Sequence, residues 1–194
     1  MLEMLEKIKK KYPFLPEEKL MEIIGQGEIV MLEEGEVFIK EGERTHKGGL
    51  VLQGMMRNYI VNDSGEEVTV VFITEMQPVA PYSTAFLNKP ATETSAAVEP
   101  TMLFVIDLNL YKKKAETDPD YMRIYIQVIE SLLVNAIERI EDFTKKKPEQ
   151  RYQRLLESHG FLIERAPLKY LASYLGITPV SLSRIRKRVS QNRN

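Results

Sequence analysis

The sequence predicts an α+β chain of 194 residues, in which an antiparallel β-roll with flanking helices precedes a long helix and a small helical domain. Three observations predict this order. Apolar residues recur at helical spacing near both ends of the chain, and short β-branched runs alternate with glycine turns between them. The C-terminal part is also strongly basic. We expect the three parts at residues 1–117, 118–147 and 148–194.

The first 28 residues favour helices, because Leu5, Ile8, Leu20 and Ile23 recur at helical spacing around a break at Tyr12-Pro13. From residue 29 the pattern changes to short strands separated by glycine turns. Such closely spaced strands favour a roll of the double-stranded β-helix or jelly-roll type. The predicted strands are 37–39, 50–52, 58–61, 68–73 and 103–106.

One of these turns, residues 62–66, has the composition of a hairpin tip. Gly65 can adopt the positive φ that such a turn requires, which is costly for other residues. The two strands on either side are therefore expected to pair with each other.

A long helix is predicted from Asp118, which can cap it, with Pro119 in its first turn. A helix of about 25 residues is roughly 37 Å long, more than a small roll can cover. Its apolar residues follow a nearly heptad stripe, which favours a homodimer seam over packing along its own domain. The seam residues are Met122, Tyr125, Ile126, Ile129, Leu132, Leu133, Ala136, Ile137, Ile140 and Phe143.

Near the C-terminus the pattern is that of two short helices joined by a tight turn. Pro167 begins the first helix, and Gly176 stands where a left-handed stop is needed. Thr178 can cap the second helix, and Ala172 is small where two helices would cross closely. This is a helix-turn-helix pattern, in which the second helix enters the major groove of DNA. The alternative is an ordinary helical hairpin.

The net charge of −1 conceals two parts of opposite sign. Residues 148–194 hold nine Lys and Arg against three Glu, a net charge of +6, so residues 1–147 carry −7. A basic end favours a polyanionic partner, here double-stranded DNA. The alternative is a basic face that only meets solvent.

Composition excludes several classes of protein. Without cysteine there can be no disulfide framework, cysteine-ligated iron–sulfur cluster or cysteine nucleophile. Two histidines, His46 and His159, are too few for a histidine-rich metal site, so we expect no metal and no catalytic residue. The N-terminus mixes charges unlike a signal peptide, and no apolar stretch reaches the ~20 residues of a membrane span. We expect a cytoplasmic protein without a membrane partner.

The acidic roll, the long helix and the segment YLASYLGITPVSLSRIRK together resemble the Crp–Fnr family of bacterial transcription regulators. The resemblance implies a cyclic-nucleotide-binding-like roll as sensor, a dimerising helix and a DNA-binding domain. It implies a homodimer on a near-palindromic operator, with RNA polymerase as a further partner and no enzymatic activity. The chain reaches Asn194 just past the second helix, so we expect the family's trailing β-wing to be absent.

The resemblance also implies site residues. Arg184 matches the arginine that reads guanine, and Thr178 and Ser181 match hydroxyl groups that contact phosphate. Pro179 and Val180 stand where known members carry arginine and glutamate, so the operator is expected to differ from the best-known one. The DNA-binding set is Lys169, Thr178, Pro179, Val180, Ser181, Ser183, Arg184, Arg186, Lys187 and Arg188.

The ligand pocket is expected to be degenerate. Pro81 replaces the family's ribose-binding glutamate and Glu93 replaces its phosphate-binding arginine, and a carboxylate repels a phosphate. No arginine lies between Arg57 and Arg123 that could take the place of the phosphate-binding arginine. We expect no cyclic AMP and no cyclic GMP, and the effector stays unidentified. A signal on the roll is hypothesised to act through the long helix. The pocket residues are Ala80, Pro81, Tyr82, Glu93 and Thr94.

Two other functions were weighed. One is a ligand-binding regulatory module that acts through protein partners and has a degenerate helix-turn-helix. The other is a cupin-type enzyme, since cupins share a similar roll. Cupin metal sites need several histidines on one metal, and His46 and His159 lie in different predicted domains.

Overall fold

The computed structural model describes residues 2–191 of the chain. These residues form two compact units. The first unit comprises Met1–Ile60 and Phe72–Glu130, and the second comprises Val61–Val71 and Ser131–Asn194. The division falls within the long helix and within a β-hairpin, whereas the sequence-based boundaries followed the ends of the long helix.

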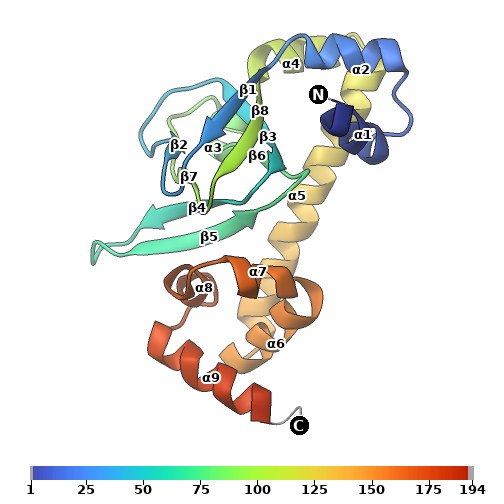
Figure 1. Cartoon of the computed structure of the whole chain (residues 1–194). Helices are drawn as coiled ribbons and strands as arrows, with labels where there is room; N and C mark the ends of the chain where they lie inside the picture. Colours follow the sequence, from blue (N-terminus) through green and yellow to red (C-terminus); the bar gives the residue numbers. More distant parts are fainter. Residues whose placement is uncertain (1, 192–194) are drawn as a thin grey trace. The chain divides into compact units, whose positions relative to one another are not determined.

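The strands form an antiparallel roll of two four-stranded sheets, which belongs to the first unit except for the end of β4 and most of β5 (Figure 1). The strand order is β1-β8-β3-β6 in one sheet and β2-β7-β4-β5 in the other, and the paired strands with a stated register are antiparallel. This confirms the α+β class and the roll. The strands are β1 Glu28–Leu32, β2 Val37–Ile39, β3 Lys47–Gln53, β4 Met56–Val61, β5 Glu67–Ile73, β6 Pro78–Val79, β7 Thr94–Ala97 and β8 Thr101–Asp107.

The hairpin tip between β4 and β5 has the expected conformation. Gly65 has a φ of 78°, and the side-chain oxygen of Asn62 accepts hydrogen bonds from the N–H groups of Ser64 and Glu66 at 3.0 and 2.9 Å. An asparagine that binds its own turn in this way fixes the tip without help from distant residues.

Helices cover the outer face of one sheet and form the core of the first unit with it. Ile8, Leu20 and Tyr121 are buried in this core beside Phe104 of β8. The predicted break at Tyr12-Pro13 separates α1 from α2 and is confirmed, whereas α3 and α4 were not predicted. The helices are α1 Leu2–Lys11, α2 Glu17–Ile24, α3 Tyr82–Leu87, α4 Leu108–Ala115 and α5 Pro119–Lys145.

The predicted long helix is α5, and its start is held by charged groups. Asp118 accepts a hydrogen bond from the N–H of Asp120 at 3.0 Å and pairs with Lys19 of α2 at 2.7 Å. Glu22 of α2 pairs with Lys19 at 2.7 Å and also with Lys114 of α4. These contacts tie α2, α4 and the first turn of α5 together. Within the described residues, no helix is both long and apolar enough to cross a membrane.

The second unit contains four short helices after the long one (Figure 1). The predicted pair is present, and a further short helix, α7, was not predicted. The helices of this unit bury Leu171, Ala172, Leu182, Ile185 and Val189. These helices are α6 Pro148–Ser158, α7 Gly160–Arg165, α8 Leu168–Tyr174 and α9 Pro179–Gln191.

Candidate nucleic-acid interface

The turn between α8 and α9 requires a glycine at position 176. Gly176 has a φ of 67°, and a Cβ built on it would lie only 2.8 Å from Cε1 of Phe143. The N–H of Ile177 donates to the carbonyl of Ala172 at 3.0 Å, which closes the C-terminal end of α8. The angle at which α9 leaves α8 is therefore set by the backbone and by packing against α5.

The N-terminus of α9 is capped as predicted. The Thr178 hydroxyl accepts a hydrogen bond from the N–H of Ser181 at 3.2 Å and donates to the Ser181 hydroxyl at 3.0 Å. Pro179 occupies the first helical position, where its missing N–H costs nothing. Both hydroxyl groups thus stabilise the helix start, and their phosphate contacts remain a prediction.

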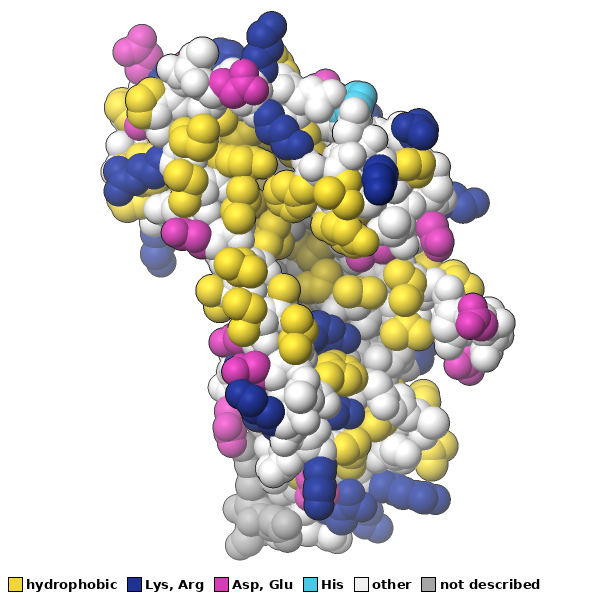
Figure 2. All heavy atoms as spheres, turned by 180° about the vertical axis from the view of Figure 1, so that it is seen from behind, with side chains coloured by type: hydrophobic (Ala, Val, Ile, Leu, Met, Phe, Trp, Pro, Cys, Tyr) yellow, Lys and Arg dark blue, Asp and Glu magenta, His cyan; other side chains and the backbone are white. Residues whose placement is uncertain are grey.

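One face of α9 is exposed and the opposite face is buried. Five of the exposed residues recur at spacings of three and four, so they form one stripe along the helix. Val180 is 61% exposed and lies one turn before Arg184. The dark-blue side chains at the lower end of Figure 2 lie over this part of the chain. The recognition stripe consists of Pro179, Val180, Ser183, Arg184 and Lys187.

Two arginines of the predicted DNA-binding set, Arg186 and Arg188, are engaged within the domain. The Arg186 guanidinium donates to the carbonyl of Ile163 in α7 at 3.3 Å, and its Nε is buried. Arg188 pairs with Glu149 of α6 at 2.9 Å. Arg186 therefore points into the helical packing and away from the recognition stripe. Arg188 remains exposed, so its pair can be exchanged for a phosphate.

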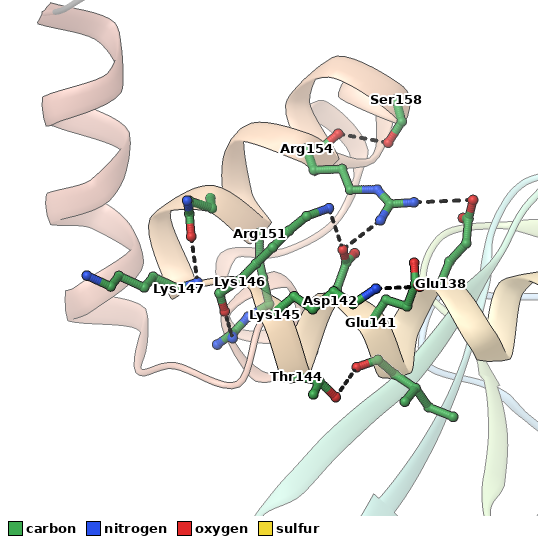
Figure 3. A network of polar contacts seen from close by, with 12 residues as sticks. Glu138, Glu141, Asp142, Thr144, Lys145, Lys146, Lys147, Arg151, Arg154 and Ser158 are labelled. Carbon is green, nitrogen blue, oxygen red and sulfur yellow. Dashed lines mark hydrogen bonds and ion pairs between the residues drawn. The ribbon is translucent and has the colours of Figure 1, made fainter.

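The basic residues of α6 also have structural partners (Figure 3). Arg154 pairs with Asp142 of α5 at 2.7 Å and with Glu138 at 3.2 Å, and Lys146 shares Asp142 at 2.7 Å. Arg151 donates to the carbonyl of Lys146 at 2.8 Å. These contacts hold α6 against the end of α5. The net charge of the C-terminal segment thus overstates what it presents to a polyanion.

The strand β5 contacts α8 within the second unit, which the sequence did not indicate. The N–H of Thr69 donates to the Ser173 hydroxyl at 3.2 Å, and this hydroxyl donates to Oγ1 of Thr69 at 3.0 Å. Arg139 of α5 donates to the carbonyls of Thr69 and Tyr174 at 3.4 and 3.1 Å. Burial lowers the pKa of this guanidinium. Residues 104 positions apart leave no local signal for such a contact.

Most of the predicted dimer seam is exposed, as an unpaired seam must be in a single chain. Leu133 is 57% exposed and Ile140 is 65% exposed. The yellow side chains along the long helix in Figure 2 include this surface. The exposed apolar stripe consists of Met122, Ile126, Ile129, Leu132, Leu133, Ala136, Ile137 and Ile140.

The two remaining seam residues have partners in their own units. Tyr125 is half-buried against the core of the first unit. Phe143 lies between the guanidinium groups of Arg139 and Arg151, at 4.8 and 4.5 Å from its ring centre, and next to Gly176. Phe143 therefore supports the turn of the helix-turn-helix, a role that the heptad pattern does not reveal.

The predicted pocket residues Pro81, Glu93 and Thr94 are buried in the first unit, whereas Tyr82 is exposed. The Glu93 carboxylate accepts hydrogen bonds from Nδ2 of Asn58 at 2.8 Å and from the N–H of Tyr82. Burial raises the pKa of Glu93, and these two hydrogen bonds oppose that shift. This acceptor-only group does not fit the phosphate of a cyclic nucleotide. No metal site made of His, Asp or Glu occurs among the described residues.

Comparisons with known proteins agree with this architecture. Residues 29–118 match the family model of the cyclic nucleotide-binding domain. FixK2 from Bradyrhizobium japonicum is 16% identical, with 86% of this chain and 85% of that chain covered and a TM-score of 0.71. The c-di-GMP responsive global regulator CLP from Xanthomonas campestris is 14% identical, with 89% and 91% covered and a TM-score of 0.72.

The catabolite activator protein of Thermus thermophilus is 15% identical, with 92% of this chain and 85% of that chain covered and a TM-score of 0.56. No curated protein matches the chain in sequence. At such low identities the similarity shows a common fold, and this is the fold that the resemblance implied.

Proposed function

We propose that the chain, whose residues 29–118 match the cyclic nucleotide-binding domain and whose fold is that of Crp–Fnr-type transcription regulators, is a sequence-specific DNA-binding regulator without enzymatic activity. It binds a near-palindromic operator as a homodimer and is not controlled by cyclic AMP. The observation that carries the proposal is the recognition stripe of α9. A capped helix start, an apolar tip and an exposed arginine one turn later lie on one face.

In the proposed complex α9 enters the major groove with its N-terminal residues towards the base edges. Arg184 makes a bidentate contact with guanine O6 and N7. Lys187 on the same stripe and Lys169, exposed on α8, neutralise backbone phosphates. Thr178 and Ser181 supply backbone and hydroxyl donors at the helix start, where an anion is favoured.

Dimerisation is supported by the exposed apolar stripe of α5. A second copy of the same helix would bury this stripe in an isologous coiled-coil seam. Two recognition helices related by a two-fold axis would then meet half-sites about one helical turn apart. Replacing Leu133 by Glu is expected to shift the protein to a monomer in sedimentation equilibrium, whereas Asn135→Glu on another face of α5 leaves the dimer intact.

The absence of cyclic AMP control is supported by the donors and acceptors of the roll. A cyclic nucleotide needs a cation for its phosphate and an acceptor for its ribose, and Glu93 and Pro81 supply neither. Calorimetry with cyclic AMP is expected to show no binding to the intact chain. Micromolar binding would refute this part of the proposal and leave DNA binding untouched.

A gel shift on random duplex DNA at increasing salt tests DNA binding itself. We expect binding at low salt that weakens steeply as salt rises, because phosphate contacts release counterions. Selection from random sequences should then enrich a near-palindrome. A chain that binds no duplex even at low salt is not a DNA-binding regulator, and a module that acts through protein partners would take its place.

A cupin-type enzyme is not supported, because the described residues group no metal ligands. RNA polymerase is a proposed further partner, and the proposed site of action is the cytoplasm. Whether transcription is activated or repressed follows from the position of the operator, which the selection experiment would reveal.

A further inference from the structure

The roll of the first unit holds a buried carboxylate at the place where the family resemblance implies an arginine. Glu93 is only 7% exposed, and Asn58 and Ser95 beside it are 3% and 0% exposed. Asn58 and Ser95 face each other across the β4–β7 ladder, and Glu93 directly precedes β7. The carboxylate is therefore built into the sheet and is not a surface group that happens to be covered.

Every polar atom in this cluster has a defined direction. The Ser95 hydroxyl donates to Oδ1 of Asn58 at 2.8 Å, which turns the amide nitrogen of Asn58 towards Glu93 at 2.8 Å. An ionised carboxylate can only accept hydrogen bonds, and it receives a second one from the N–H of Tyr82 at the start of α3.

Both donors are uncharged and directed at the Glu93 carboxylate, and the Asn58 amide is buried. A buried amide is costly to leave without an acceptor, so the site requires an occupant. In a roll that binds an external anionic ligand, that ligand would accept these hydrogen bonds. In this chain the carboxylate of Glu93, directly before β7, accepts them instead.

We propose that Glu93 is the internal ligand of the roll, a built-in carboxylate that satisfies Asn58 and Tyr82 and makes the fold of the roll independent of any external anion. The inference deepens the proposed function, because it explains a regulator whose roll does not respond to cyclic nucleotides. It also predicts that the roll regains a need for an anion once this carboxylate is removed.

The test is chemical rescue in the intact chain. Glu93→Ala removes the carboxylate and leaves the buried Asn58 amide without its acceptor beside a small void, so its melting temperature is expected to fall by about 5 °C. Sodium formate or acetate, compared with chloride at equal ionic strength, should restore about half of this loss. The wild type and Glu34→Ala, which removes an exposed carboxylate of the same unit, should melt alike in all three salts.

A second variant keeps the test decisive if Glu93→Ala does not fold. Glu93→Gln retains a carbonyl oxygen for both donors, so it should melt within about 2 °C of the wild type and show no preference for carboxylate salts. Equal melting of Glu93→Ala and the wild type, or equal rescue by chloride, would overturn the proposal. If neither Glu93→Ala nor Glu93→Gln folds, the proposal is also overturned. DNA binding by the wild type is a separate readout, so the proposed function can fail without this inference.

Discussion

Ser173 of α8 and Thr69 of β5 are joined by two hydrogen bonds, one through the N–H of Thr69 at 3.2 Å and one between the two hydroxyl groups at 3.0 Å. Both residues belong to the second unit, so this contact holds part of β5 against the first helix of the helix-turn-helix within that unit. The sequence-based hypothesis named the long helix as the route of a signal. The β4–β5 hairpin, like the long helix, belongs in part to each unit.

Replacing Ser173 by Ala should remove the hydrogen bonds between Ser173 and Thr69. The change removes the acceptor of the Thr69 N–H and is expected to lower the free energy of unfolding of the second unit by about 1 kcal/mol. Hydrogen exchange at the Thr69 amide should accelerate. Ser190→Ala, which removes an exposed hydroxyl of α9, is the matched control. Unchanged exchange at Thr69 would mean that the contact contributes nothing to stability.

Arg184→Ala tests the base-reading role of the recognition stripe. Loss of a bidentate contact with guanine is expected to reduce discrimination by roughly 1–3 kcal/mol at one base pair of each half-site. Affinity for random duplex DNA should change far less. Titrations of the selected operator and of a random duplex measure both quantities. An equal loss on both duplexes would assign Arg184 to the phosphates instead.

Val180→Ala tests the apolar tip of the same stripe. The 61% exposed side chain of Val180 cannot hydrogen-bond a base, but it can contact the methyl group of thymine, the apolar group of the major groove. Deoxyuridine in place of the contacted thymine should weaken binding about fourfold, the value of one buried methyl group. In Val180→Ala the two duplexes should bind alike. If no thymine in the half-site shows this dependence, Val180 does not read bases.

The ion pairs of Glu22 with Lys19 and Lys114 make the free energy of unfolding depend on pH in the acid range. Hydrogen bonds from Lys114 and Lys19 lower the pKa of Glu22 from 4.5 to about 2. A lowered pKa means that the stabilisation is present above pH 4.5 and is lost as the pH falls towards 2. Denaturant unfolding should therefore show that Glu22→Gln is less stable than the wild type near neutrality, with a difference that shrinks below pH 4.5. The exposed Glu18→Gln on the same helix should show no such difference.

Features with a local cause could be predicted from the sequence. Gly65 and Gly176 both have the positive φ that their turns require, and Thr178 caps α9 as its position indicates. The apolar stripe of α5 was also visible, because its period depends only on helical geometry.

Other elements lacked such signals. All four residues of β7 are buried, so the alternation that identifies a half-buried strand is absent. Arg186 has the residue type of a phosphate ligand, but its partner, the carbonyl of Ile163, is set by packing between helices. Phe143 is 44% exposed and stays available to the predicted seam, and its additional contact with Gly176 is set by the same packing. A pattern of charged or apolar residues does not reveal such tertiary contacts.

The internal pairing of the basic residues also has a consequence for the ionic strength at which the protein works. Arg151, Arg154 and Arg186 hold the helical domain together, so they displace few condensed cations from DNA. If Lys169, Arg184 and Lys187 of both subunits are the residues that displace cations from DNA, a plot of log affinity against log salt concentration has a slope of about −5. Such a regulator would keep more of its affinity in a salty cell than its total positive charge implies.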